Sequence, residues 1–127
     1  MPVYSHILHG ILDDSGKPNQ LPHSSMLSVR NTDPSFEMRI LSVKYFDNDG
    51  KLLREYLKKP VSLPPMGSTD YFVDYLDRRG GTGANFLVVW KADRPINQPI
   101  LETINVYFFG VQSQAFVSRG QAIHPHK

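Results

Sequence analysis

The sequence predicts an all-β domain, a two-sheet immunoglobulin-like sandwich of about eight strands. Apolar and polar residues alternate over short spans, a pattern typical of strands with one buried face. Turn-forming residues separate these spans roughly every 8–15 residues, and no stretch combines helical periodicity with capping residues. A closed β-barrel would give the same pattern and is the alternative fold.

The composition is that of one globular domain. The 127 residues are 40% hydrophobic and 20% charged, so we predict a single domain over residues 1–127 that folds without a metal. The chain has no cysteine, which excludes disulfides, thiolate metal sites and cysteine nucleophiles. No apolar stretch reaches the roughly 18 residues of a membrane span. The net charge of +2 is scattered along the chain, which argues against nucleic acid as a partner.

The first quarter of the chain predicts two strands. The first covers residues 3–8 and is followed by a loop over residues 13–23, which is rich in glycine and proline. The second covers residues 26–31, with Leu27 and Val29 facing the core. The residues from Asn31 to Pro34 end it, because proline cannot donate to a β-ladder and Asn and Asp favour turns.

The clearest local feature is a hairpin. A strand over residues 39–46 would place Leu41, Val43 and Tyr45 on one face. The turn at residues 47–50 ends in a glycine, which can adopt the positive φ that tight hairpins require. Residues 52–57 form the returning strand.

The second half of the chain continues the pattern. Residues 60–68 predict a crossing loop with a short extended piece at 61–63, and residues 93–99 a second loop. The strand over residues 85–91 is almost continuously apolar, which indicates a position in the middle of a sheet. The other predicted strands cover residues 70–76, 100–109 and 115–119.

The glycine-rich segment GGTGAN at residues 80–85 is the first candidate site. Phosphate-binding loops lead from a strand into a helix, whereas this loop leads into a strand and lacks the Lys-Ser/Thr pair. The segment therefore predicts a turn that uses positive φ, with Asn85 bonded to the backbone inside it. A rigid loop beside two arginines could also recognise a partner. The candidate contact residues are Arg78, Arg79, Gly81, Thr82, Gly83 and Asn85.

The histidines near the chain ends are the second candidate site. His124 and His126 would lie on one side of an extended tail, and such a pair can bind Cu(II), Ni(II) or Zn(II). His6 or His9 could supply a third ligand if the ends meet. The alternative is a solvated tail with no metal.

Catalytic and cofactor motifs are absent from the sequence. It contains neither the G-x-S-x-G nor the H-E-x-x-H pattern. Asp47, Asn48 and Asp49 begin like a calcium loop, but position twelve is Lys58 where such a loop needs Glu. We therefore expect no enzymatic activity and no cofactor.

Several segments carry a family resemblance. They are PVYSHILHG at residues 2–10, VRNTDP at 29–34, VKYFD at 43–47 with Gly50, REYLKKP at 54–60, PMGST at 65–69, GGTGANF at 80–86 and SRG at 118–120. Together they resemble the bacterial family called domain of unknown function 3124 over nearly the whole chain, although residues 108–116 are shorter than the family's pattern. The resemblance implies no particular chemistry. It does imply export to the periplasm or cell surface, with a signal preceding Met1.

These observations predict a non-enzymatic, exported protein-interaction module of the bacterial envelope, whose partner would be an envelope protein. The expected contact elements are the loop at residues 78–85, the loop at 31–34 with Asn31 and Asp33, and the segment 118–120 with Arg119. The alternative function is a small-ligand or metal-binding domain that uses the terminal histidines.

Overall fold

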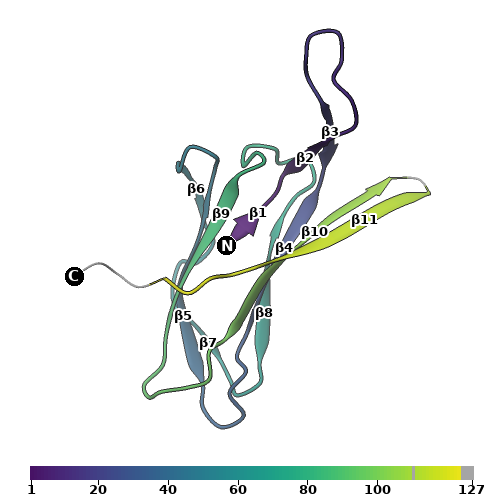
Figure 1. Ribbon diagram of the computed structural model, residues 1–127. Coiled ribbons are helices and arrows are strands. Elements are labelled where there is room, and N and C mark those ends of the chain that lie inside the picture. Colours follow the sequence, from purple (N-terminus) through teal and green to yellow (C-terminus); the bar gives the residue numbers. More distant parts are fainter. Residues whose placement is uncertain (110, 124–127) are drawn as a thin grey trace.

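The chain forms two antiparallel sheets that enclose a common core (Figure 1). The computed structural model describes residues 1–109 and 111–123. In this part of the chain all the regular structure is β, and no helix is present that could span a membrane. Both sheets are open at their edges rather than closed into a barrel. The predicted all-β sandwich is therefore confirmed.

The first sheet has five strands. Its order is β1 (Pro2–Val3), β9 (Ala84–Lys91), β5 (Met38–Phe46) and β6 (Leu52–Glu55), with β7 (Val61–Leu63) also pairing with β5. The second sheet has four strands in the order β11 (Gln112–Arg119), β10 (Ile100–Phe109), β4 (Ser24–Arg30) and β8 (Ser68–Val73). A separate two-stranded ribbon pairs β2 (His6–His9) with β3 (Asn19–Pro22).

The core is formed by alternate residues of both sheets, as expected for strands with one buried face. Leu27 and Val29 of β4 are completely buried, as predicted. Tyr45 of β5 and Phe86 of β9 stack with ring centroids 5.1 Å apart. The other buried apolar side chains are Val3, Met38, Ile40, Val43, Leu63, Val73 and Ala84.

Strand β5 contains a β-bulge that the alternation did not predict. Its register against β9 shifts between Ile40 and Ser42, so an extra residue stands opposite the partner strand. As a result Ile40, rather than Leu41, is fully buried together with Val43. The prediction that Leu41 shares the face of Val43 and Tyr45 was wrong for this reason.

The described residues contain eleven strands rather than about eight. The predicted strand at residues 3–8 is divided into β1 and β2, because Ser5 leaves the first sheet to bond Gly81. The predicted loop at residues 13–23 contains β3. It returns along β2, and the pair projects from the sandwich as a hairpin (Figure 1).

The two hairpin turns are built alike. In the projecting hairpin Asp13 accepts hydrogen bonds from the amides of Ser15 and Lys17, and Gly16 has a φ of 79°. In the β5–β6 hairpin Asp47 accepts bonds from the amides of Asp49 and Lys51, and Gly50 has a φ of 77°. The pattern D-x-x-G-K therefore specifies the same turn twice. The turn predicted at residues 47–50 is confirmed.

Candidate functional site

The glycine loop at residues 78–85 is bonded into the domain. Gly81 has a φ of 85°, and its amide donates to Oγ of Ser5 at 2.9 Å. The amide of Gly83 donates to Oδ1 of Asn48. The Asn85 side chain donates to the carbonyl of Gly83 at 3.4 Å, as predicted. The loop's polar groups thus serve mainly to fix its own shape.

Of the other side chains of this loop, that of Arg79 is held by an ion pair. Arg79 binds the carboxylate of Asp77 through two hydrogen bonds of 2.9 and 2.8 Å. This contact lowers the pKa of Asp77 below its usual value. Arg78 is exposed and Thr82 is half-buried.

The loop at residues 31–34 is also held in place by hydrogen bonds to neighbouring segments. Asn31 is buried, and its side-chain amide donates to the carbonyls of Phe36 at 2.9 Å and Pro64 at 3.0 Å. The Asp33 carboxylate accepts bonds from the amides of Ser35, Phe36 and Asn97. These bonds, chiefly those from Ser35 and Asn97, lower the pKa of Asp33. Both side chains tie neighbouring loops together and have little capacity left for a partner.

The structure does not bring the three predicted contact elements together. The loop at 31–34 lies near Met38, where β5 begins, and the glycine loop lies near Phe46, where β5 ends. The segment at 118–120 ends β11 on the second sheet and is fixed by a bond of 2.7 Å from the Gly120 amide to the Leu101 carbonyl. Of the predicted residues, only Asn85 and Arg119 line the same hollow.

The predicted metal ligands His124 and His126 lie outside the described residues. Within residues 1–109 and 111–123, no group of three or more metal-ligating side chains comes together. His6 lies with Nδ1 3.0 Å from Oγ of Ser5, and His9 is exposed on the projecting hairpin.

His23 is a buried group that the sequence did not single out. It is completely buried between β3 and β4, and Phe116 packs edge-on against its ring at 5.2 Å. Neither ring nitrogen has a hydrogen-bond partner among the described residues. Burial, with a contribution from the nearby charge of His6, lowers the pKa of His23.

A groove of about 870 Å³ lies between the two sheets of the described structure. We call it the β9 groove. Its floor includes Val88 and Trp90 of β9, and its opposite wall includes Leu101 and the segment after β11. Figure 1 shows that segment leaving β11 and running back across the sheets towards the C-terminus. The residues lining the groove are Met1, Pro2, Asn85, Phe86, Leu87, Val88, Trp90, Ile96, Gln98, Pro99, Leu101, Arg119, Gly120, Gln121, Ala122 and Ile123.

The residues that line this groove are mostly apolar, polar groups are exposed in it to a comparable extent, and it carries little charge. Among the described residues that line the groove, Arg119 has the one charged side chain, and none is a histidine, a carboxylic acid or a serine. Trp90 is the only tryptophan in the sequence. Pockets of roughly 300–1,000 Å³ with apolar walls and few polar groups are typical of binding sites. No local sequence pattern indicates this groove, because its walls come from both ends and the middle of the chain.

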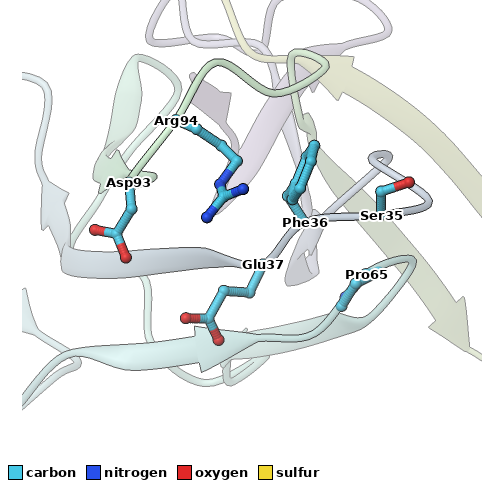
Figure 2. Close-up of a pocket in the computed structure, with 6 residues that line it drawn as sticks. All are labelled: Ser35, Phe36, Glu37, Pro65, Asp93 and Arg94. Atoms are coloured by element: carbon cyan, nitrogen blue, oxygen red, sulfur yellow. The ribbon is translucent and has the colours of Figure 1, made fainter.

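A second, smaller hollow of about 320 Å³ lies among loops (Figure 2). Arg94 lies over the ring of Phe36, with Cζ 4.5 Å from the ring centroid. Asp93 pairs with Arg39 at 2.7 Å. Figure 2 shows Glu37 below the Arg94 guanidinium. These opposite charges largely compensate one another, so this hollow is the weaker candidate.

Comparisons with known proteins support the fold. The family model described as Protein of unknown function (DUF3124) matches residues 1–123. The crystal structure of Thermotoga maritima 1070 is similar to this chain, with 12% identity and a TM-score of 0.50, over 93% of this chain and 89% of that one. At this identity the likeness shows the fold alone. A search of the curated proteins found no match.

Proposed function

We propose a function for this chain from one premise, that it belongs to the family described as Protein of unknown function (DUF3124). The function is that of an exported, non-enzymatic protein-interaction module of the bacterial envelope, which holds its partner in the β9 groove. The β9 groove is the observation that carries this proposal. Its size and its mixture of apolar side chains and uncharged polar groups suit a bound molecule, and its two walls come from different sheets.

The lining supports binding rather than catalysis. General acid–base catalysis needs a titratable group within hydrogen-bond reach of the reacting atoms. The described lining offers the guanidinium of Arg119, amide groups and apolar side chains. The immunoglobulin-like description is part of the same proposal. It is supported by two open antiparallel sheets around one core. The envelope location rests on the family resemblance described above.

A small apolar ligand is the second candidate for the groove. The volume of about 870 Å³ lies within the usual range for small-molecule sites. A ligand of this kind would be enclosed by Trp90, Ile96 and Leu101 rather than by backbone groups.

Site-specific photo-cross-linking tests the proposed function. A photoreactive amino acid replaces Gln98 or Gln121 in the groove, and Gln20 on the projecting hairpin serves as the matched exposed control. The protein is irradiated in bacterial cells that export it, and the envelope fraction is separated. We expect one discrete cross-linked envelope protein from both groove positions and none from position 20. Equal cross-linking from all three positions, or none from the groove, would contradict the proposal.

A further inference from the structure

The second sheet has an inner face that belongs to the core and an outer face that points away from it. Its strands are neighbours in the order β11, β10, β4 and β8 (Figure 1). Leu27 and Val29 of β4 are buried on the inner face, and Phe116 of β11 packs on His23 on the same side. Because side chains alternate along a strand, the residues between these lie on the outer face.

One row of the outer face is apolar across all four strands. The strand register places four side chains next to one another in it, in the order Val117, Ile104, Met26 and Phe72. Val117 is 53% exposed and Phe72 56% exposed at the two ends, and the two middle residues are half-buried. We call this row the apolar strip. Continuous exposed apolar surface of this kind is typical of an interface.

The neighbouring row carries opposite charges at its two ends. It runs from Arg119 on β11 through Glu102 and Ser28 to Asp70 on β8. Arg119 also borders the end of the β9 groove. Arg119 and Asp70 are exposed, and neither forms an ion pair with another residue of the described chain. A basic residue therefore stands at one edge of the sheet and an acidic residue at the other.

A second copy of this chain fits both rows at once. Packed sheets keep their strands within about 30° of one another. A two-fold axis that runs along the strands, between β10 and β4, places each row against its own copy in reverse order. Val117 of one copy then faces Phe72 of the other, and Arg119 faces Asp70. Because the axis repeats every contact, this arrangement forms two pairs of opposite charge, one at each edge of the apolar strip.

The size of this face sets the strength of such a contact. Four strands about 4.8 Å apart and four rows about 6.7 Å apart cover on the order of 500 Å² of each copy. The total of about 1,000 Å² is near the lower limit for specific interfaces. We therefore expect a dissociation constant for the dimer in the micromolar range.

We propose that the outer face of the second sheet is the interface of a symmetric homodimer, in which two apolar strips pack together and Arg119 of each copy pairs with Asp70 of the other. This inference goes beyond the proposed function and does not depend on it. The β9 groove lies between the two sheets of one copy, so the dimer would present two grooves.

Analytical ultracentrifugation of the full chain tests the dimer, over about 1–500 µM because the expected affinity is micromolar. We expect a reversible equilibrium between monomer and dimer. Val117→Asp puts a charge into the apolar strip of both copies and should weaken dimerisation about tenfold or more. Val89→Asp is the matched control, since Val89 is a 43% exposed valine on the outer face of the first sheet. It should leave the equilibrium unchanged, and thermal unfolding checks that both variants fold.

Charge reversal tests the two-fold arrangement itself, with exposed residues that the fold tolerates more readily. Asp70→Arg alone and Arg119→Asp alone each bring like charges together at both edges, so each should weaken dimerisation several-fold. When the two variants are mixed, both pairs regain opposite charges. The mixture should therefore form heterodimers about as strongly as the parent protein forms dimers, and high salt should reduce this preference.

Three results would overturn the inference. The first is a chain that stays monomeric over the whole concentration range. The second is a dimer that Val117→Asp leaves as strong as Val89→Asp does, because another surface would then hold it. The third is a mixture of the charge-reversed variants that forms no heterodimer. Cross-linking from groove positions 98 and 121 is measured separately in cells, so the dimer and the proposed function can fail independently.

Discussion

Ser5 and Gly81 hold each other through reciprocal hydrogen bonds. The Ser5 amide donates to the Gly81 carbonyl at 3.0 Å, and the Gly81 amide donates to Oγ of Ser5 at 2.9 Å. Both residues are buried. This contact joins the segment between β1 and β2 to the glycine loop before β9, and it places β1 next to the edge that forms the β9 groove.

The Ser5 hydroxyl should therefore contribute to stability. Ser5→Ala leaves the buried Gly81 amide without its acceptor, and we expect the free energy of unfolding to fall by about 1–3 kcal/mol. Urea denaturation measures the change. Ser35→Ala, at an exposed position, is the control and should change stability by less than about 0.5 kcal/mol. Equal effects of the two substitutions would show that the Ser5–Gly81 contact is dispensable.

Gly80 should not tolerate a side chain. A Cβ atom there would lie 2.0 Å from the hydroxyl oxygen of Tyr45 and 2.9 Å from Cβ of Ala84. We expect Gly80→Ala to cost about 1–3 kcal/mol. Gly83→Ala is the matched control, because its nearest contact is the side chain of Asn48 at 3.0 Å, and it should cost less.

The Tyr45 hydroxyl itself is predicted to add no stability. It is buried without a hydrogen-bond partner among the described residues, and burial raises the pKa of Tyr45 to about 12. We expect Tyr45→Phe to be neutral or stabilising in thermal unfolding, because it removes an unsatisfied polar group. In a double-mutant cycle it should also recover part of the loss caused by Gly80→Ala. Strong destabilisation by Tyr45→Phe would indicate a hydrogen bond that this account lacks.

The two related turns should respond differently to the same substitution. Gly16 and Gly50 both have positive φ, and a Cβ atom on either would meet nothing within 4 Å. Because φ is positive, alanine at either position costs about 1–2 kcal/mol of local backbone strain and adds no steric clash. We expect Gly50→Ala to lower global stability by this amount in urea. Gly16→Ala should mainly speed amide exchange in the β2–β3 ribbon, which pairs with neither large sheet. Equal global losses would contradict this separation.

His23 should make the fold sensitive to mild acid. Its pKa in the folded protein lies below the ordinary value of 6.5, so the unfolded chain binds this proton first as the pH falls. The neutral form stabilises the fold above pH 6.5, and that stability is lost as the pH drops below it towards the folded pKa. We expect the melting temperature to fall between pH 7.5 and about pH 5.

A pair of variants isolates this effect. His23→Phe keeps an aromatic ring beside Phe116 and should flatten the pH dependence in this range. His9→Gln, on the exposed hairpin, should leave it as in the parent protein. If His23→Phe retains the full pH dependence, another group is responsible.

The sequence predicted the large elements because one-sided burial leaves a period-two pattern. β4, β9 and β10 appear within a few residues of their expected positions. The β2–β3 ribbon was missed, since glycine and prolines in residues 13–23 indicated a loop. The match between D-x-x-G-K at residues 13–17 and at 47–51 could have revealed it. The bulge between Ile40 and Ser42 was missed because the adjacent apolar residues Ile40 and Leu41 fit either phase of the alternation.

The candidate site was much harder to predict. Asn31 and Asp33 are polar residues in a loop, as contact residues often are, but they are satisfied by neighbouring backbone groups. The β9 groove depends on how β9 lies against Leu101 of the other sheet and on how the segment after β11 crosses. Both are properties of tertiary structure that local sequence does not encode.

Labelling Trp90 as 5-fluorotryptophan gives one fluorine signal from the β9 groove, because the chain has no other tryptophan. Adding the purified envelope protein that cross-links from positions 98 and 121 should shift or broaden this signal until the groove is saturated. A signal that stays unchanged while the complex forms would contradict binding in the β9 groove.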